Sequence, residues 1–122
     1  VSPMVKGGIE CILGAKIDPV FGPIVMFGLG GIYAEVMKDI AFAEAPVSNK
    51  KAEKMILSLK GKDIFYGARG QSSVDIKALK DIIVNLSNFI AANSNQIDQV
   101  EMNPVLVSDK QVIALDALII TK

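Results

Sequence analysis

Histidine and tryptophan are absent from the 122 residues, and cysteine occurs once, as Cys11. A single cysteine cannot form an internal disulfide, and without histidine no Cys/His cluster can hold zinc. The missing histidine also excludes every mechanism in which this chain alone supplies a histidine base or a phosphorylated histidine. It leaves Cys11 without an imidazole to activate it, so we expect a buried structural thiol and no nucleophile.

Net charge is absent as well. Thirteen Lys and Arg balance thirteen Asp and Glu, so no overall field attracts nucleic acid or an anionic membrane. Mean hydropathy is high at +0.42, but the most apolar stretch, residues 19–33, is short and broken by prolines and glycines, unlike a membrane-spanning helix. No charged segment followed by an apolar one opens the chain, which argues against a secretion signal. The sequence predicts a cytoplasmic protein that contacts neither nucleic acid nor membrane.

The residues that are present are typical of a globular domain, with 51% apolar and 21% charged. Residues 9–17, 24–27, 32–37 and 40–43 are short runs rich in strand-forming residues. Turn signals such as Asp18-Pro19 and Gly22-Pro23 lie between the runs. These runs predict an antiparallel sheet in a single domain. Because the sequence opens in the middle of an element, we also expect it to be a piece of a longer polypeptide.

Two helices are predicted in the middle of the chain. Ser48 can cap a short helix, followed by a loop over residues 60–73 and a longer helix that ends at residues 93–95. The apolar residues of the longer helix form one stripe: Ile76, Leu79, Ile82, Ile83, Leu86, Phe89 and Ile90. Two strands, residues 99–107 and 111–121, close the chain. The predicted fold class is α+β, an antiparallel sheet with two helices packed on one face.

Three oxygen-bearing side chains converge in the predicted C-terminal hairpin. If Asp109 and Lys110 form a two-residue turn, residues whose numbers sum to 219 are opposed, and Asn103 faces Asp116. Glu101 lies two positions from Asn103 and therefore on the same face. Two carboxylates and an amide this close favour a cation, and Mg²⁺ prefers such hard oxygen ligands. The same pattern also fits an edge patch of solvated polar side chains.

The alternate positions of the same two strands are apolar. Because side chains alternate between the faces of a strand, these positions are predicted to face the core. They are Val100, Met102, Leu106, Ile113, Leu115, Ala117 and Ile119.

The hairpin also resembles a known family. The segment 100–105 (VEMNPV) followed by Leu115-Asp116-Ala117 is similar to the metal-binding end of ATP-grasp enzymes, in the group of ADP-forming acyl-CoA synthetases and succinyl-CoA synthetase β-subunits. Residues 7–10 (GGIE), 18–31, Glu35, Asp39 and 67–70 (GARG) are closer to the ADP-forming acyl-CoA synthetases. The resemblance covers nearly the whole chain.

This resemblance implies that residues 1–122 are the C-terminal part of an ATP-grasp domain, in which ATP or ADP binds between two α+β subdomains. It implies Asn103 and Asp116 as Mg²⁺ ligands, with Glu101 as a further ligand or as a base beside them; many relatives have Asp at this position. The implied reaction is acyl-CoA + ADP + phosphate ⇌ acid + CoA + ATP, through acyl phosphate and a phosphohistidine. The implied partners are the nucleotide, the remaining ATP-grasp subdomain and CoA-binding α-type domains or an α-type subunit.

Five further residues are candidates for contacting the nucleotide. Gly28, Gly30 and Gly31 would let backbone N–H groups approach a phosphate, although such a cluster is also typical of a plain tight turn. Arg69, flanked by glycines, would clamp a phosphate or remain an ordinary loop arginine. Glu10 lies on a strand and faces either the nucleotide cleft or solvent.

Two classes of function fit these features. In the first, the chain is the Mg²⁺-nucleotide part of an ADP-forming acid–CoA ligase, and by itself it shows no turnover because the phosphohistidine lies elsewhere. In the second, it is a non-catalytic or regulatory ATP-grasp-like module of a larger protein, such as a lysine acetyltransferase. Succinyl-CoA synthetase itself is a further alternative, disfavoured by residues 18–31. The acid, the choice of ADP or GDP and the attachment of the α-type domains stay open.

Overall fold

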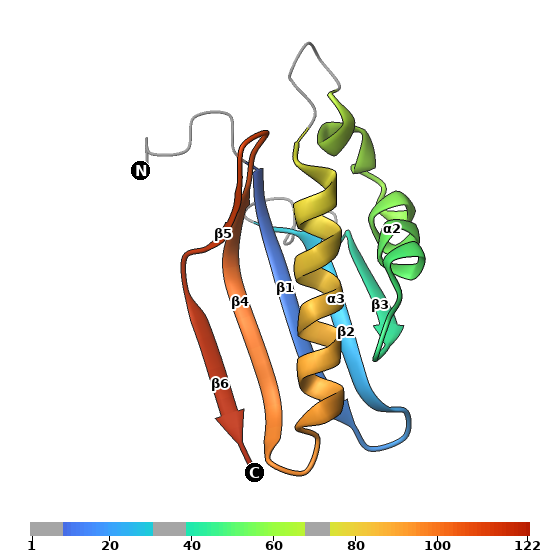
Figure 1. Ribbon diagram of the computed structural model, residues 1–122, viewed down its shortest axis with the longest axis vertical. Helices are drawn as coiled ribbons and strands as arrows, with labels where there is room; N and C mark the ends of the chain where they lie inside the picture. Colours follow the sequence, from blue (N-terminus) through green and yellow to red (C-terminus); the bar gives the residue numbers. More distant parts are fainter. Residues whose placement is uncertain (1–8, 31–38, 68–73) are drawn as a thin grey trace.

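The computed structural model describes residues 9–30, 39–67 and 74–122. Its elements follow in the order β1 (Ile9–Asp18), β2 (Gly22–Leu29), β3 (Ile40–Glu44), α2 (Asn49–Ser58), the 3₁₀ helix η1 (Lys62–Tyr66), α3 (Ile76–Ala92), β4 (Ile97–Val107), β5 (Val112–Ala114) and β6 (Ala117–Thr121). Figure 1 shows α2 and α3 side by side on one face of the sheet. The predicted α+β class and its two helices on one face are confirmed.

The sheet is antiparallel in every pairing and has the order β3-β2-β1-β4-β5, with β6 also paired to β4. One face is covered by α2 and α3. In the described part of the chain no helix lies over the other face (Figure 1), which is called the open face below. The strand registers place Gly14, Met26, Phe42 and Glu101 beside one another on the open face.

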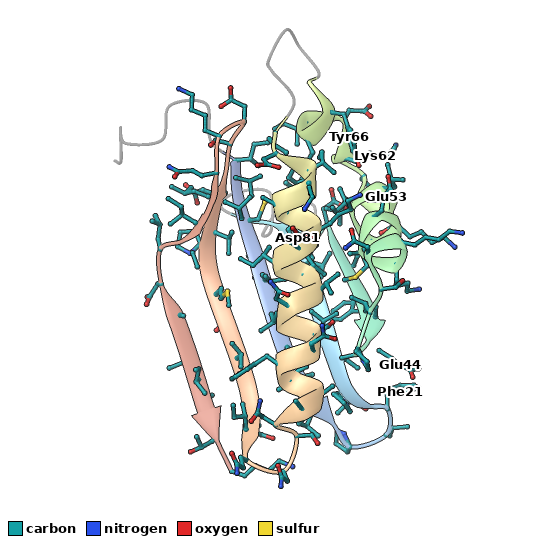
Figure 2. All side chains as sticks on the ribbon, viewed as in Figure 1. Phe21, Glu44, Glu53, Lys62, Tyr66 and Asp81 are labelled. Atoms are coloured by element: carbon teal, nitrogen blue, oxygen red, sulfur yellow. The ribbon has the colours of Figure 1, made fainter. Side chains whose placement is uncertain are left out.

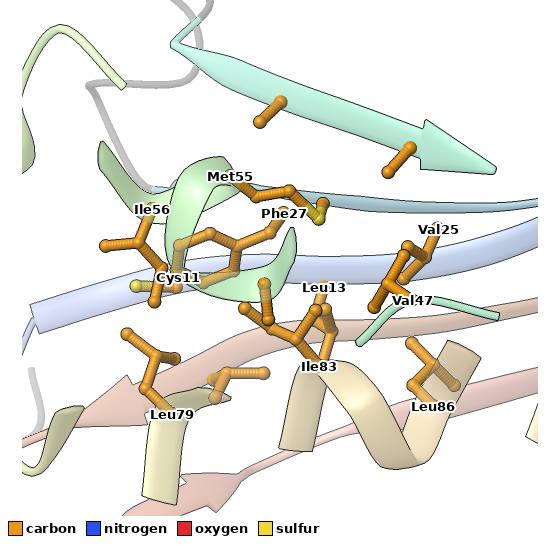
Figure 3. Close-up of a cluster of buried hydrophobic side chains, with 14 of the residues drawn as sticks. Cys11, Leu13, Val25, Phe27, Val47, Met55, Ile56, Leu79, Ile83 and Leu86 are labelled. Carbon is orange, nitrogen blue, oxygen red and sulfur yellow. The ribbon is translucent and has the colours of Figure 1, made fainter. Parts of the chain in front are cut away.

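The covered face carries the core. Alternate residues of β1, such as Cys11 and Leu13, are buried together with Val25 and Phe27 of β2 (Figure 3). The Phe27 ring lies 5.9 Å from that of Phe65 in η1, measured between centroids. Burial, with a smaller contribution from the charge of Glu10, raises the pKa of the Cys11 thiol. Cys11 is therefore a protonated core residue, as the sequence predicted.

Both helices begin where the sequence supplies a cap. The Ser48 hydroxyl accepts a hydrogen bond from Lys51 N, and the Asp75 carboxylate accepts one from Ala78 N, both at 3.0 Å. Phe89 was expected on the apolar stripe of α3 but is 41% exposed. It precedes the fully buried Ile90 by one residue and is thus rotated by about 100° around the helix axis. No helix in the described ranges is long and apolar enough to cross a bilayer.

A buried carboxylate connects the start of β3 with the turn after α2. Asp39 is 4% exposed, and its two oxygens accept hydrogen bonds from Lys60 N and Gly61 N, both at 2.7 Å. Its backbone oxygen accepts a further bond from Leu29 N at 3.1 Å. Asp39 therefore joins three segments of the chain: the end of β2, the start of β3 and the turn after α2.

The turn between β1 and β2 depends on Asp18. One carboxylate oxygen, Oδ2, accepts hydrogen bonds from Val20 N at 2.8 Å and Phe21 N at 2.9 Å; Figure 2 shows Phe21 at this turn. These two bonds, with a smaller contribution from Lys16, hold the pKa of Asp18 below its ordinary value. The prediction that Asp18-Pro19 makes a turn is confirmed.

Stability should therefore depend on the charge of Asp18. Since the folded pKa is lower than the unfolded one, the stabilising contribution is present above the unfolded pKa and is lost as pH falls through the folded pKa. We expect the carboxyl carbon of Asp18, followed by NMR, to titrate at lower pH in the folded chain than in a short peptide with the sequence of residues 16–22. Equal titration midpoints would contradict the hydrogen-bonded turn.

Candidate metal and nucleotide site

The C-terminal hairpin has the predicted register. Val107 pairs with Val112, Val105 with Ala114 and Glu101 with Leu118. Between these pairs, Asn103 N donates a hydrogen bond to Asp116 O at 3.3 Å. Asn103 and Asp116 therefore stand opposite each other. The outer strand is not continuous as expected, however, because it is interrupted at Leu115 and Asp116 between β5 and β6.

A β-bulge in β4 lies at this interruption. Cys11 of β1 pairs with Val105, but Leu13 pairs with Met102, so β4 has one residue more than β1 between these pairs. The two residues at positions 103 and 104 together oppose Ile12, which lies on the open face. Pro104 suits this place because it has no N–H to donate to a neighbouring strand. Bulges change the direction of side chains and are frequent beside active sites.

The bulge corrects the predicted alternation. Val100 and Met102 face the helices as expected, but beyond the bulge the core positions are Val105 and Val107. Leu106 was expected in the core and is buried, but it pairs with Glu10 on the open face and lies outside the core cluster beneath the helices. A hairpin register cannot reveal this change, because the extra residue is defined only by the pairing of β4 with β1.

The outer strand segments were also expected to contribute to the core, and this is wrong. Their residues are exposed: Ile113, Leu115, Ala117 and Ile119. The reason is the position of α3, which packs on β1 and β2 and only lightly on β4. Figure 1 shows β5 and β6 at the edge of the sheet, beyond this helix.

The side chains of the opposed pair are accessible to an ion. Both Asn103 and Asp116 are exposed. Asp116 Oδ1 accepts a hydrogen bond from Ala117 N at 2.9 Å, while its Oδ2 accepts none from the described residues. In these same ranges no three His, Cys, Asp or Glu side chains form a group that could hold a metal. One carboxylate and one amide suit Mg²⁺, which commonly takes few protein ligands and completes its shell with phosphates and water.

The two predicted glutamates lie on the open face. Glu101 is half-buried and pairs with Gly14 of β1. Glu10 is exposed and opposes Leu106. In the described residues around them no cation forms an ion pair with either side chain. Both carboxylates are thus on the open face. Their roles in binding metal or nucleotide remain predictions.

The two glycines that are described have structural reasons to be glycine. Gly28 lies within β2 and not in a turn, and a Cβ atom there would lie 2.6 Å from Asp39 O. Gly30 donates its N–H to Glu10 O at 2.8 Å, so that N–H is already engaged. Gly31 and Arg69 lie outside the described residues. A phosphate-binding role for the cluster remains a prediction.

The close approach at Gly28 has a measurable consequence. We expect Gly28→Ala to lower the free energy of unfolding by about 2 kcal/mol, because β3 must shift away from the added methyl group. Gly30→Ala is the comparison variant and should cost less, since its Cβ would meet the nearest backbone atoms at 3.3–3.4 Å, a tight contact without the overlap at Gly28. Urea denaturation of both variants without nucleotide measures the difference. Equal stability of Gly28→Ala and the wild type would refute the packing explanation.

A hollow of about 290 Å³ opens beside Glu101 on the open face. Its lining includes Lys16, Met26, Phe42 and Gln99. Lys16 and Gln99 are paired across β1 and β4, as are Gly14 and Glu101 two residues further along. Lys16 and Gln99 were not identified from the sequence as residues that line this hollow. The only signal for them was their position two residues from Gly14 and Glu101. The hollow therefore adjoins Glu101, whereas Asn103 and Asp116 do not line it.

Comparison with known proteins decides the family. The model of a family described as the ATP-grasp domain matches residues 1–121. The chain belongs to the ATP-grasp family. This ATP-grasp domain is 47% identical over 107 residues to the ADP-forming 4-hydroxybutyrate–CoA ligase of Nitrosopumilus maritimus, covering 88% of this chain and 15% of that protein. It is 40% identical over 124 residues to the β subunit of ADP-forming acetate–CoA ligase II of Pyrococcus furiosus, covering 100% of this chain and 52% of that subunit.

Solved structures confirm the ATP-grasp fold. Acetyl-coenzyme A synthetase 1 of Ca. Korarchaeum cryptofilum, in complex with coenzyme A and Ca-AMPCP, superposes with a TM-score of 0.88 at 40% identity, over 94% of this chain and 50% of that one. In a second structure of that enzyme, with Mg-AMPPCP, the phosphohistidine segment points towards the nucleotide binding site; its TM-score is 0.87 at 40% identity, over 94% of this chain and 54% of that one. The ATP-grasp domain thus spans about half the length of these chains.

Proposed function

We propose that this ATP-grasp domain is the Mg²⁺-nucleotide-binding part of an ADP-forming acid–CoA ligase. Residues 1–122 would form the C-terminal part of the nucleotide-binding unit. The observation that carries the proposal is the register that places Asn103 opposite Asp116, beside a bulge on the open face. The names of the relatives support the reaction class, since they are ADP-forming ligases of acetate and 4-hydroxybutyrate.

In this proposal Asn103 and Asp116 each provide one oxygen to Mg²⁺, and Glu101 provides a further oxygen or orients a water molecule on the ion. The bound Mg²⁺ neutralises phosphate charge during phosphoryl transfer. The bulge supports this arrangement because it brings Asn103 and Pro104 opposite the open-face residue Ile12. The backbone hydrogen bond from Asn103 N to Asp116 O keeps the two ligands side by side, which suits a reaction that depends on the position of the phosphates.

The phosphohistidine must come from outside these residues, because the chain has no histidine. The solved relative with a phosphohistidine segment directed at its nucleotide site supports such an arrangement. We therefore propose two partners, the remaining ATP-grasp subdomain and CoA-binding domains or a CoA-binding subunit. A protein of this kind would work in the cytoplasm.

The test is an activity assay of the native protein that carries these residues, with its other domains or subunits. Acetyl-CoA or 4-hydroxybutyryl-CoA is incubated with ADP, phosphate and Mg²⁺, and ATP formation is measured. We expect ATP from at least one acyl-CoA and none when Mg²⁺ is chelated, while the 122 residues alone stay inactive. Binding of Mg²⁺-ADP without turnover of any acyl-CoA would instead favour a regulatory module.

A further inference from the structure

The outermost strand segment, β6, is an apolar edge. Among the described residues it pairs only with β4, and no described strand pairs with its other side. All five residues of Ala117–Thr121 are exposed, including Leu118 at 54% and Ile119 at 52%. None of the five is charged, and none is proline. Natural edge strands usually carry charged residues or proline, which prevent pairing with another chain. Because β6 has neither, it is suited to accept a further strand.

The backbone of β6 shows which groups are free to pair. Asp116 O accepts a hydrogen bond from Asn103 N, and Lys122 N donates one to Gln96 O. Along an antiparallel strand, the residues that bond to one neighbour alternate with those directed to the other side. Even-numbered residues are therefore bonded to β4. The N–H and C=O groups of Ala117, Ile119 and Thr121 are directed outwards, and of these the Ala117 N–H already donates to Asp116 Oδ1 at 2.9 Å.

We propose that β6 is a self-association edge, on which β6 of a second copy of this chain adds as an antiparallel strand in a two-fold register centred on Ile119. This register lets Ile119 bond reciprocally with its own counterpart, while Thr121 N of each copy donates to Ala117 O of the other; the Ala117 N–H stays with the Asp116 carboxylate. It places Leu118 of each copy opposite Ile120 of the other, an apolar pair that recurs by symmetry.

Charge complementarity favours a second copy over another occupant. In the same register, Asp116 of one copy stands opposite Lys122 of the other, so two pairs of opposite charges flank the apolar segment. Shifting the register by two residues would lose one of the three outward backbone pairs and separate Asp116 from Lys122. Since one short strand buries less than the roughly 1,200 Å² of stable complexes, the association is weak and depends on concentration.

Sedimentation velocity over a series of concentrations measures this association. EDTA is present throughout, because Asp116 is also a proposed Mg²⁺ ligand; the result is then independent of the proposed function. We expect a reversible monomer–dimer equilibrium, weakened about 10-fold or more by Ile119→Lys, which opposes two like charges at the symmetry axis. Ile113→Lys, at an exposed position on β5, is the matched control and should leave the equilibrium unchanged. Circular dichroism verifies that both variants are folded.

Disulfide cross-linking tests the register itself. Ile119→Cys should cross-link to its own copy, because hydrogen-bonded partners lie about 5.5 Å apart between Cα atoms, a distance that a disulfide spans. Ala117→Cys and Thr121→Cys should each fail alone, since their own copies lie about 13 Å away along the strand. A mixture of these two variants should form the heterodimer. Cys11 does not interfere because it is fully buried.

Three results would overturn the proposal. One is a chain that stays monomeric at every concentration. Another is equal cross-linking of all three cysteine variants, which indicates unspecific aggregation. The last is cross-linking of Ile119→Cys in the 122-residue chain but not in the native protein, which would mean that another segment covers β6 there.

Discussion

Replacing Asp116 by asparagine is expected to weaken the binding of Mg²⁺-ADP at least 10- to 100-fold. Loss of a group that merely supports a metal ligand costs about that much, and the proposed site offers only one carboxylate in addition to Glu101. Binding of ADP without metal should change little, because Asp116 would contact the nucleotide only through the ion. In the native protein, the rate of ATP formation at a fixed low Mg²⁺ concentration should fall by at least the same factor.

Isothermal titration with ADP, at several Mg²⁺ concentrations, separates these two effects. Asp109→Asn is the matched control, since Asp109 is an exposed carboxylate in the turn of the same hairpin. We expect this control to bind Mg²⁺-ADP as the wild type does. If Asp116→Asn and Asp109→Asn both bind like the wild type, Asp116 is not a metal ligand.

Removing the Asp39 carboxylate should have the largest effect on stability. In Asp39→Ala the N–H groups of Lys60 and Gly61 lose a charged acceptor that binds both at 2.7 Å. A hydrogen bond to a charged group contributes about 1.5–3 kcal/mol, so we expect a loss of about 3–5 kcal/mol in the free energy of unfolding. Asp39→Asn keeps one acceptor oxygen and should lose less.

Urea denaturation of the chain measures both Asp39 variants. The exposed Asp98 in β4 provides the control, because Asp98→Ala removes a carboxylate with no hydrogen bond in the described structure. Surface substitutions of this kind usually change stability by no more than about 0.5 kcal/mol. An equal effect of Asp39→Ala and Asp98→Ala would show that the buried carboxylate does not stabilise the fold.

The hairpin register and both helices could be predicted because their signals are local. A polar two-residue turn at Asp109 and Lys110 determines which residues face each other, and so it places Asn103 opposite Asp116. Ser48 caps α2, and the spacing of apolar residues defines the buried side of both helices. Such features are encoded by a few neighbouring residues, and no distant contact overrides them.

The bulge and the exposure of β6 could not be predicted, because each depends on a distant element. The bulge at Asn103 and Pro104 is defined against β1, some ninety positions earlier in the chain. The exposure of Ile119 depends on where α3 crosses the sheet, and alternation alone assigned this residue to the core. Likewise, nothing near Asp39 in sequence indicates that its partners are the amides of Lys60 and Gly61.

Paramagnetic broadening by Mn²⁺ tests the central claim most directly. Mn²⁺ replaces Mg²⁺ at hard oxygen sites and broadens the NMR signals of nearby residues. Substoichiometric Mn²⁺ is added with ADP to the isotope-labelled chain, and residue-specific signals are compared before and after. We predict that the signals of Asn103 and Asp116 broaden first, and that those of Asp98 and Asp109 persist. Broadening that spares Asn103 and Asp116, or that is equal at all four residues, would contradict the proposed metal site.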